Sequence, residues 1–475
     1  MRITLLFLLT MVMGGFCLHA QNKQLLYDFT DIPQSLMMNP AADIDFKWYA
    51  GVPALSGLSF YAGSSGLSAY DLIADDGVDF NTKVRERVLN RMGISDELSG
   101  NYQIELLNVG WQGRDPDYFY SLGVYNEGDA IGYWFKDYAI LAFDGNADTF
   151  RRFDLGHLKT RGEILNVYHF GVNKRVNDKL LIGGRLKVYS GILNFTSTNN
   201  RGFLQNTQGQ NNLISTTIDA DLEMRTSGIN VLRAAESEEL ANEITKRALF
   251  GGDLGLGIDL GFTRYINEQT VLTASLLDVG FIYHSSDPKN WTLNGAATSE
   301  GVEIILPGAL SDPDRDFYQE LIDDIEALAP FEENLNSYLT FRPTKLNASL
   351  RYNFGKQVEQ NSANCDCGPY ASQSNRAPKY ANAVGGQLFA VNRPRGPQTA
   401  LTAFYLRRFG NIAGVKVTYT VDKFSATNVG LGLNLQAGPV NLYMMADNLL
   451  AYSNVFNTRY ASFQLGLNII SWGKK

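Results

Sequence analysis

The feature that most constrains the fold is a strict two-residue alternation between Gly251 and Tyr283. Apolar side chains hold every second position in its first half, at Leu254, Leu256, Ile258, Leu260 and Phe262, with small or polar residues between them. This period is typical of a strand with one apolar face, and each half exceeds the ~9–11 residues that a tilted strand needs to cross a bilayer. Because residues 266–269 between the halves are too few for a crossover helix, the stretch predicts an antiparallel transmembrane hairpin.

A closed barrel also accounts for the composition better than a set of soluble domains does. The chain has 475 residues, including 45 glycines, 24 tyrosines and 27 phenylalanines. This length would otherwise suggest two or three soluble domains, whereas a large barrel concentrates aromatic residues at the two membrane interfaces. We therefore predict an all-β fold, a transmembrane antiparallel up-and-down β-barrel of about 14 strands, with long extracellular loops that carry short helices.

The N-terminus predicts export from the cytoplasm. Arg2 precedes an apolar run over residues 3–18, and Ala20 provides a small residue for cleavage before Gln21, as in a secretory signal peptide. No later apolar run reaches the length of a spanning helix, and a closed barrel is the other structure that satisfies the backbone in lipid. We predict a signal peptide at 1–20, a periplasmic leader or plug segment at 21–46, and a barrel at 47–475 in a Gram-negative outer membrane.

The connections between the predicted strands alternate in length, as an up-and-down barrel requires. The predicted strands are 47–63, 103–111, 117–125, 161–174, 179–193, 251–265, 270–283, 345–354, 383–391, 398–409, 412–422, 425–436, 438–448 and 459–472. Short turns fall on the periplasmic side, with 357–382 as a longer exception. The long inserts 64–102, 126–160, 194–250 and 285–343 fall outside. Counts of 12 or 16 strands stay open, and 130–143 is an alternative strand within a segment that we place in a loop.

The long inserts also carry local patterns of their own. Residues 84–92 and 236–247 have the spacing of short helices, and 216–226 suggests that a strand extends beyond the membrane. Residues 312–325 predict a further helix, in which Asp312 can cap and Pro313 can hold the first helical position. We therefore expect folded surface loops.

Four short motifs resemble a group of membrane barrels. They are Met38-Asn39-Pro40-Ala41, PALSG at 53–57, LDVG at 277–280 and YMMADNL at 443–449. In order and placement they resemble the uncharacterised outer-membrane barrels of Bacteroidetes-type bacteria that are grouped with PorV, PorP and SprF of type IX secretion and gliding, and more distantly with FadL. The resemblance implies a barrel with a plug motif at Asn39, Pro40 and Ala41, and no settled activity. The leader at 21–46 is too short to imply the N-terminal hatch segment of a FadL-like barrel.

The inward phase of the predicted strands carries charges of both signs. The cations are Arg185, Lys187, Lys345, Arg351 and Lys416, and the carboxylates are Asp259, Asp278 and Asp447. Because a charge inside a lumen must be paired or hydrated, these residues predict either cross-bracing ion pairs or a selective pore, and we favour bracing. Asp278 and Asp447 are further predicted to anchor an outer loop or a plug segment near the mouth.

The sequence gives little support for catalysis, cofactor binding or nucleic-acid binding. The mature chain has His157, His169 and His284, without a serine motif of the G-x-S-x-G type. Acidic residues at 312–323 follow a calcium loop in spacing, but Phe317 stands where that loop needs glycine. Cys365 and Cys367 are too close for an unstrained disulfide. The net charge of −8 does not favour nucleic acid, and we predict no enzyme, metal or cofactor.

Two functional classes follow from these features. The first is a non-enzymatic scaffold or accessory barrel, linked to type IX secretion or surface display, that contacts other outer-membrane or secreted proteins through loops 194–250 and 285–343. The second is a FadL-like or passive channel for hydrophobic or small solutes. In either class the barrel would contact outer-membrane lipid. The last predicted strand is amphipathic, with Trp472 near its end, which is typical of strands that the barrel assembly machinery recognises.

Overall fold

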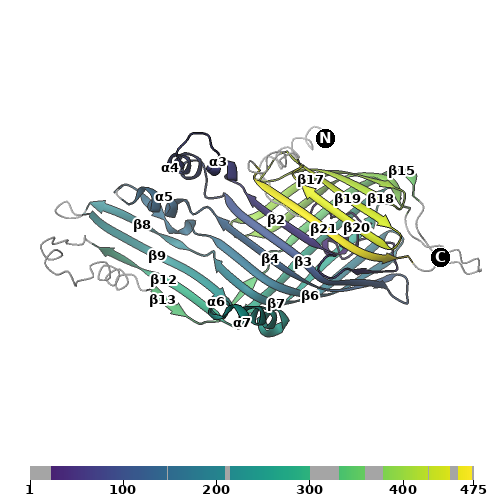
Figure 1. Cartoon of the computed structure of the whole chain (residues 1–475), viewed down its shortest axis with the longest axis horizontal. Helices are drawn as coiled ribbons and strands as arrows, with labels where there is room; N and C mark the ends of the chain where they lie inside the picture. Colours follow the sequence, from purple (N-terminus) through teal and green to yellow (C-terminus); the bar gives the residue numbers. More distant parts are fainter. Residues whose placement is uncertain are drawn as a thin grey trace, which may run out of the picture.

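The protein is a closed antiparallel β-barrel, as Figure 1 shows for a computed structural model of the chain. The structure describes residues 23–146, 148–208, 214–299, 331–358, 378–425, 427–449 and 458–472. Within these ranges the wall has 14 strands, which confirms the predicted fold class and strand count. The last strand pairs with both pieces of the first, so the sheet has no free edge around the barrel.

The wall strands follow one another around the barrel in chain order. They are β1 (Trp48–Gly51) with β2 (Leu58–Ser64), β3 (Glu97–Gln112), β4 (Tyr118–Tyr133), β6 (Thr160–Asn177), β7 (Leu180–Ser197), β10 (Asp253–Tyr265), β11 (Thr270–His284), β14 (Tyr338–Phe341) with β15 (Lys345–Gln357), β16 (Tyr380–Arg393), β17 (Gly396–Phe409), β18 (Ala413–Val421), β19 (Asn428–Ala437), β20 (Val440–Asp447) and β21 (Tyr460–Ser471). β1 and β2 form one interrupted wall strand, and β14 and β15 both pair with β11.

The hairpin predicted at 251–283 is confirmed as β10 and β11. The five alternating apolar side chains of β10 point outward and are 36–57% exposed, whereas Asp259 between them is 0% exposed. A β-bulge lies opposite Asp259, because Leu277 and Asp278 of β11 together face this one residue of β10. Both residues of the bulge are buried, and Asp278 has a positive φ of 58°. The alternation therefore gives β10 its two faces, while the bulge shifts the phase of β11.

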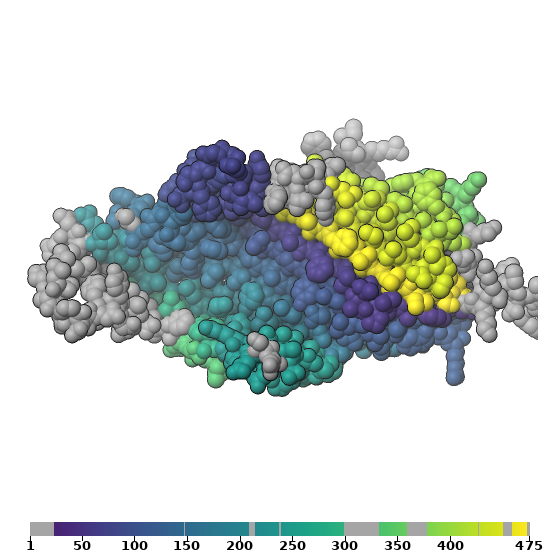
Figure 2. Space-filling model, in the orientation of Figure 1, coloured from purple at the N-terminus to yellow at the C-terminus, as the bar shows by residue number. Residues whose placement is uncertain are grey.

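A smaller sheet continues the wall beyond one end of the barrel (Figure 1), and its atoms lie at one end of the elongated surface in Figure 2. Its strands are β5 (Arg152–Asp154), β8 (Arg201–Gln208), β9 (Ile214–Ser227), β12 (Pro288–Ser299) and β13 (Phe331–Asn334). β9 joins the wall through a short pairing with the end of β7. This extension confirms that the strand pattern at 216–226 lies outside the barrel proper.

The helices of the described residues are short. They are α2 (Ser35–Met38), α3 (Ala69–Ile73), α4 (Phe80–Lys83), the π-helical turn η1 (Val84–Leu89), α5 (Lys136–Asp144), the 3-10 turn η2 (Leu155–His157), α6 (Ile229–Ala234), α7 (Ser237–Lys246) and the π-type turn η4 (Arg247–Gly251). The helices expected near 84–92 and 236–247 are thus present. None of the helices in the described part of the chain is long and apolar enough to cross a membrane.

All four predicted outer inserts include residues of wall strands, since β7 continues to Ser197 and β14 lies within 285–343. β3 already begins at Glu97 and β4 continues to Tyr133, so parts of 64–102 and 126–160 are wall strand rather than loop. These segments mix polar and apolar residues on both faces, because the strands leave the apolar band near the mouth. The alternative strand at 130–143 ends at Tyr133, and helix α5 follows, with Ile140 packed against Leu89 and Phe153. The helix predicted at 312–325 and both predicted loop cysteines lie outside the described residues.

Residues 23–46 fold into the lumen, and we call them the plug. They contain the single helical turn α2 and a series of hydrogen-bonded turns, without a strand. Leu25, Phe29 and Ile32 are 0% exposed. Because the surrounding wall would otherwise enclose an open channel, the plug forms the hydrophobic core of this barrel.

Candidate functional site

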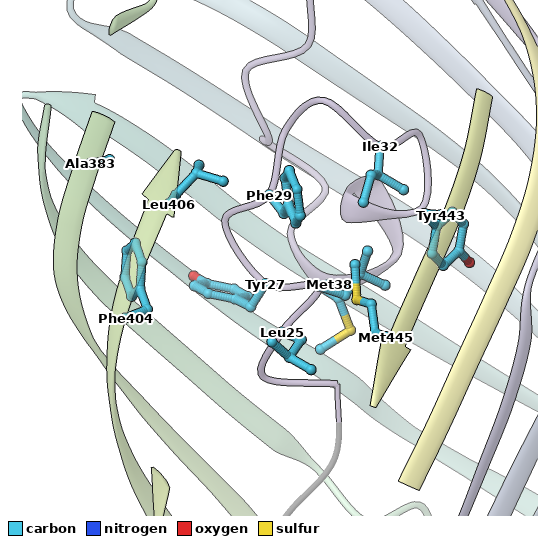
Figure 3. Packing of buried hydrophobic residues seen from close by; sticks show 11 residues of the cluster. Leu25, Tyr27, Phe29, Ile32, Met38, Ala383, Phe404, Leu406, Tyr443 and Met445 are labelled. Atoms are coloured by element: carbon cyan, nitrogen blue, oxygen red, sulfur yellow. The ribbon is translucent and has the colours of Figure 1, made fainter. Parts of the chain in front are cut away.

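One side of the plug packs through apolar contacts, as Figure 3 shows in close view. The plug residues of this cluster include Leu25, Tyr27, Phe29, Ile32 and Met38. The wall supplies Ala383 from β16, Phe404 and Leu406 from β17, and Tyr443 and Met445 from β20. Burial of aromatic and aliphatic side chains on this scale is favourable by roughly 1.5–3 kcal/mol for each side chain. The cluster therefore fixes the plug against the wall that β16 to β21 form.

The plug is also tied to the wall by its acidic residues. Asp28 accepts a hydrogen bond from Arg351 at 2.7 Å, and Asp31 pairs with Arg408 at 2.7 Å and with Lys379 at 3.0 Å. Nearer the end of the plug, the Arg175 guanidinium lies 2.6 Å from Asp43, and Asp45 lies 2.8 Å from Lys379. Arg351, which the sequence placed on the inward face, thus contacts the plug itself.

The motif Asn39-Pro40-Ala41 lies against β7 and β10. Thr263 donates a hydrogen bond of 2.8 Å to the Ala41 carbonyl, and the Asn39 side chain donates to the Phe262 carbonyl at 3.3 Å. The wall has glycines where the motif approaches. A Cβ atom at Gly183 would lie 2.3 Å from the Pro40 carbonyl, and one at Gly261 would lie 2.1 Å from the Asn39 side-chain oxygen. Both glycines therefore leave room for the motif.

A buried ionic network joins the strands next to this motif. Arg185 lies 3.1 Å and Lys187 lies 2.8 Å from Asp259, and Lys187 also lies 2.6 Å from Asp278. Asp278 pairs in addition with Lys345 at 2.7 Å, so the network spans β7, β10, β11 and β15. Arg185 also donates to the carbonyls of Leu36 and Met37 in the plug. The arrangement braces the wall and holds the α2 turn.

Asp447 and Lys416 lie on the other side of the lumen and have different partners. Asp447 accepts a 2.6 Å hydrogen bond from Ser462, and its second oxygen has no hydrogen-bond partner among the described residues. Lys416 is 0% exposed and donates to the carbonyls of Tyr27 and Gln24 in the plug. The direct partners of Asp278 and Asp447 within the described chain are on wall strands, so their anchoring of outer loops stays a prediction.

Two cavities occupy the lumen between the plug and the end that carries the long loops. The inner cavity, of about 90 Å³, has Lys23, Met37 and Met38 of the plug in its lining. The outer cavity, of about 360 Å³, opens between β6, β9, β14 and β16. Arg342, Pro343 and Arg393 line both cavities. The two cavities therefore adjoin, and the inner one extends to the plug.

The three histidines are held in structural contacts. His284 hydrogen-bonds to Asp253 and Thr340, each at 2.8 Å, but its ring is 1% exposed and stacks on Tyr338. His169 is buried beside Tyr125. His157 lies near carboxylates at the edge of α5. The described residues contain no group of three His, Cys, Asp or Glu side chains that could hold a metal ion.

The sequence analysis missed several lumen carboxylates and arginines. Arg342 pairs with Glu127 and Glu163, and Arg393 pairs with Asp129. Glu163 falls on the inward phase of a predicted strand, so the phase of that strand could have identified it. Glu127, Asp129 and Arg342 lie in segments predicted to be loops, where strand periodicity does not indicate which way a side chain points.

This molecule is a transmembrane β-barrel whose lumen is occupied by the plug. The described residues leave two cavities on the side of the long loops. The chain belongs to DUF5723, a family of unknown function, whose model matches residues 40–447. No curated protein matches the sequence.

Several solved barrels are similar in overall trace. The Ralstonia pickettii toluene transporter TbuX is 10% identical, with 96% of this chain and 95% of that chain covered and a TM-score of 0.40. A Pseudomonas aeruginosa FadL homologue is 9% identical, with 94% and 95% covered and a TM-score of 0.42. The P. putida toluene transporter TodX is 10% identical, with 96% and 95% covered and a TM-score of 0.36. A relation to PorV, PorP and SprF stays a prediction.

Proposed function

We propose that the protein is a plugged outer-membrane channel that admits small polar solutes from the cell exterior when the plug moves. The observation that carries this proposal is the inner cavity, which is lined in part by plug residues and shares Arg342, Pro343 and Arg393 with the outer cavity. A scaffold that transports no solute would not need a cavity that ends on the plug. The role is non-enzymatic and needs no cofactor.

The orientation follows from the connections between the strands. The end of the barrel with the smaller sheet carries the long loops, and the opposite end carries short turns such as 266–269 and 410–412. In outer-membrane barrels the short turns face the periplasm. Outward apolar side chains on the wall, such as Leu256 at 57% exposure, favour a lipid environment. These features support the outer membrane as the location and the loop end as the solute entrance.

The lining favours polar solutes over hydrophobic ones. Charged side chains in the inner cavity include Lys23, Glu127, Asp129, Lys187 and Arg342. An apolar solute would have to displace water from these groups without replacing its hydrogen bonds, which is unfavourable. A small polar solute can replace them.

The plug must move for passage because its buried aromatic residues fill the lumen. Its contacts with the wall are noncovalent in the described residues, and many are polar, so water can replace them as the plug leaves. The pairs of Asp28 with Arg351 and of Asp31 with Arg408 and Lys379 would hold the closed state.

Swelling of proteoliposomes in a neutral pentose such as arabinose tests this function. The variant Asp28→Asn with Asp31→Asn should swell the vesicles several-fold faster than the wild type, because it weakens three ion pairs of the plug. The matched control is Asp76→Asn, whose carboxylate pairs with Lys83 and Arg87 in an outer loop and should not alter the rate. If the folded double variant admits no more solute than protein-free vesicles, the channel function is wrong.

The scaffold predicted from the sequence is the second candidate. It is favoured by the sheet of β8, β9, β12 and β13 that continues beyond the barrel (Figure 1), with Met224 40% and Leu335 69% exposed near its strands. Such a surface could contact other outer-membrane or secreted proteins, including those of type IX secretion. Affinity purification from native outer membrane tests this candidate. A partner that is lost when Met224 and Leu335 are replaced by Ser would support it.

A further inference from the structure

The outer cavity carries an excess of positive charge. Five cations line it, namely Lys159, Arg161, Arg225, Arg342 and Arg393, whereas Glu223 is the one carboxylate in its lining. Glu163, Glu127 and Asp129 lie behind this surface and pair with Arg161, Arg342 and Arg393. Arg225 pairs with Glu223 at 2.5 Å, so Lys159 is the lining cation without a described carboxylate partner. These pairs neutralise part of the charge and hold the guanidinium groups in place.

Several donors of the residues that line this cavity lack an acceptor or a carboxylate partner in the described residues. The Nε groups of Arg161, Arg342 and Arg393 are buried and have no hydrogen-bond partner in the described part of the chain. Buried donors of this kind usually bind an acceptor. Lys159 pairs with no described carboxylate and donates instead to the Thr198 carbonyl at 2.8 Å. Burial, and then the nearby Arg395 and Arg201 guanidinium groups, lower the pKa of Lys159.

The cavity lies inside the mouth of the barrel rather than on its lipid-facing wall. Arg161 is at the start of β6, Arg393 is at the end of β16, and these strands are not neighbours in the wall. Arg342, between β14 and β15, is 4% exposed and also lines the inner cavity above the plug. A ligand that contacts these three arginines must therefore lie within the entrance.

We infer that the outer cavity binds a small multivalent anion with carboxylate or phosphate groups. Guanidinium groups match such oxygens in pairs, and arginine is preferred over lysine for this purpose. The inference deepens the proposed channel function and rests on it for the class of solute. Carboxylate or phosphate groups could come from a free solute or from a lipid headgroup. Because the arginines converge inside the mouth, the free solute is the form that the geometry favours.

Isothermal titration calorimetry on the full chain in a nonionic detergent tests the site, with citrate and inorganic pyrophosphate as the probes. The variant Lys159→Gln with Arg225→Gln should raise the Kd of both probes by about tenfold or more, a change that corresponds to ~1.4 kcal/mol. The matched control is Arg85→Gln with Lys246→Gln, which removes the same charge from exposed positions outside the cavity. The control should keep the wild-type Kd within about twofold, since exposed charges are largely screened.

The outcomes separate this inference from the channel function. Equal weakening in the two variants would show general electrostatic attraction and overturn the site. Binding of lipid A in detergent micelles, without binding of citrate or pyrophosphate, would overturn the free-solute assignment. Arabinose uptake without anion binding would leave the channel intact and refute this inference. Anion binding that the cavity variant weakens, in a protein that admits no solute, would support the site and refute the channel.

Discussion

The plug is held between two walls of very different chemistry. Strands β7, β10, β11 and β15 meet it with a buried ionic network around Asp259 and with close backbone contacts at Gly183 and Gly261. Strands β16 to β21 meet it largely with apolar side chains (Figure 3) and with one buried ion pair, that of Arg408 with Asp31. Their buried ions Lys416 and Asp447 have no ion-pair partner within 4 Å in the described residues.

This difference indicates how a lumen can be filled and still open. Ion pairs and tight glycine contacts depend on one position, whereas an apolar surface tolerates small displacements. We therefore expect the first wall to set where the plug lies and the second wall to contribute adhesion without fixing its position. Movement of the plug would begin with release of its ion pairs, including that of Asp31 with Arg408 on the second wall.

The largest effect should come from removing the centre of the ionic network. Asp259→Ala leaves Arg185 and Lys187 short of a buried partner, and we expect the free energy of unfolding to fall by ~3–5 kcal/mol. Asp447→Ala, the control from the other wall, removes one hydrogen bond with Ser462 and should cost ~1 kcal/mol. Urea unfolding in detergent, followed by heat-modifiability on gels, measures both. Equal losses would remove the distinction between the walls.

A smaller effect should follow when the close contact with the plug is blocked. Gly183→Ala places a Cβ 2.3 Å from the Pro40 carbonyl, so the backbone must shift, at ~1–3 kcal/mol. Gly386→Ala on β16 is the matched control, because no atom lies within 4 Å of its added Cβ. Limited proteolysis of the plug should speed up in the first variant alone. Equal protection of the plug in both variants would contradict its close fit to β7.

The buried lysine of the second wall should be nearly dispensable. Lys416→Met removes a charge that is costly to bury, and the Tyr27 carbonyl keeps its hydrogen bond of 3.1 Å from Gln387. We expect the unfolding free energy to change by no more than ~1 kcal/mol. A loss close to that of Asp259→Ala in the same urea titration would mean that the two walls are ionic to a similar degree.

A pH dependence is expected near the outer end of the second wall. Asp422, in the turn after β18, is 7% exposed, and burial raises its pKa to about 7. The folded protein therefore keeps a proton that the unfolded chain loses near pH 4, so stability falls as the pH rises from about 4 to 7 and then levels off. Asp422→Asn should remove this slope in thermal unfolding scans. An unchanged slope would show that another group titrates.

The sequence predicts the wall of this barrel well because each strand encodes its own two faces. The apolar phase of Leu254 to Phe262 is local, and it specified β10, its turn and its partner. The bulge at Leu277 and Asp278 could not be predicted, since it depends on how β11 fits Asp259 across the hairpin. Segments beyond the apolar band, such as 126–133, lack the alternation of apolar and polar residues, so the sequence predicts a loop there.

The contacts of the plug were much less predictable than the wall. Residues 23–46 have no period, and their partners lie far along the chain, as in the hydrogen bond of 2.8 Å between Gln34 and Asn468. The inward charges were predictable as a set, but not their pairing. Arg351, for example, meets Asp28 of the plug rather than a carboxylate of the wall. Such pairings depend on three-dimensional register, which one sequence does not show.

Closure of the barrel by the plug can be tested by planar-bilayer conductance. The full chain should give low conductance with rare openings, and deletion of residues 23–46 should give large, steady steps. If the deletion prevents folding, Gly183→Ala provides the second measurement and should open more often than Gly386→Ala. Large, steady conductance from the full chain, or equal conductance from all folded variants, would contradict the account.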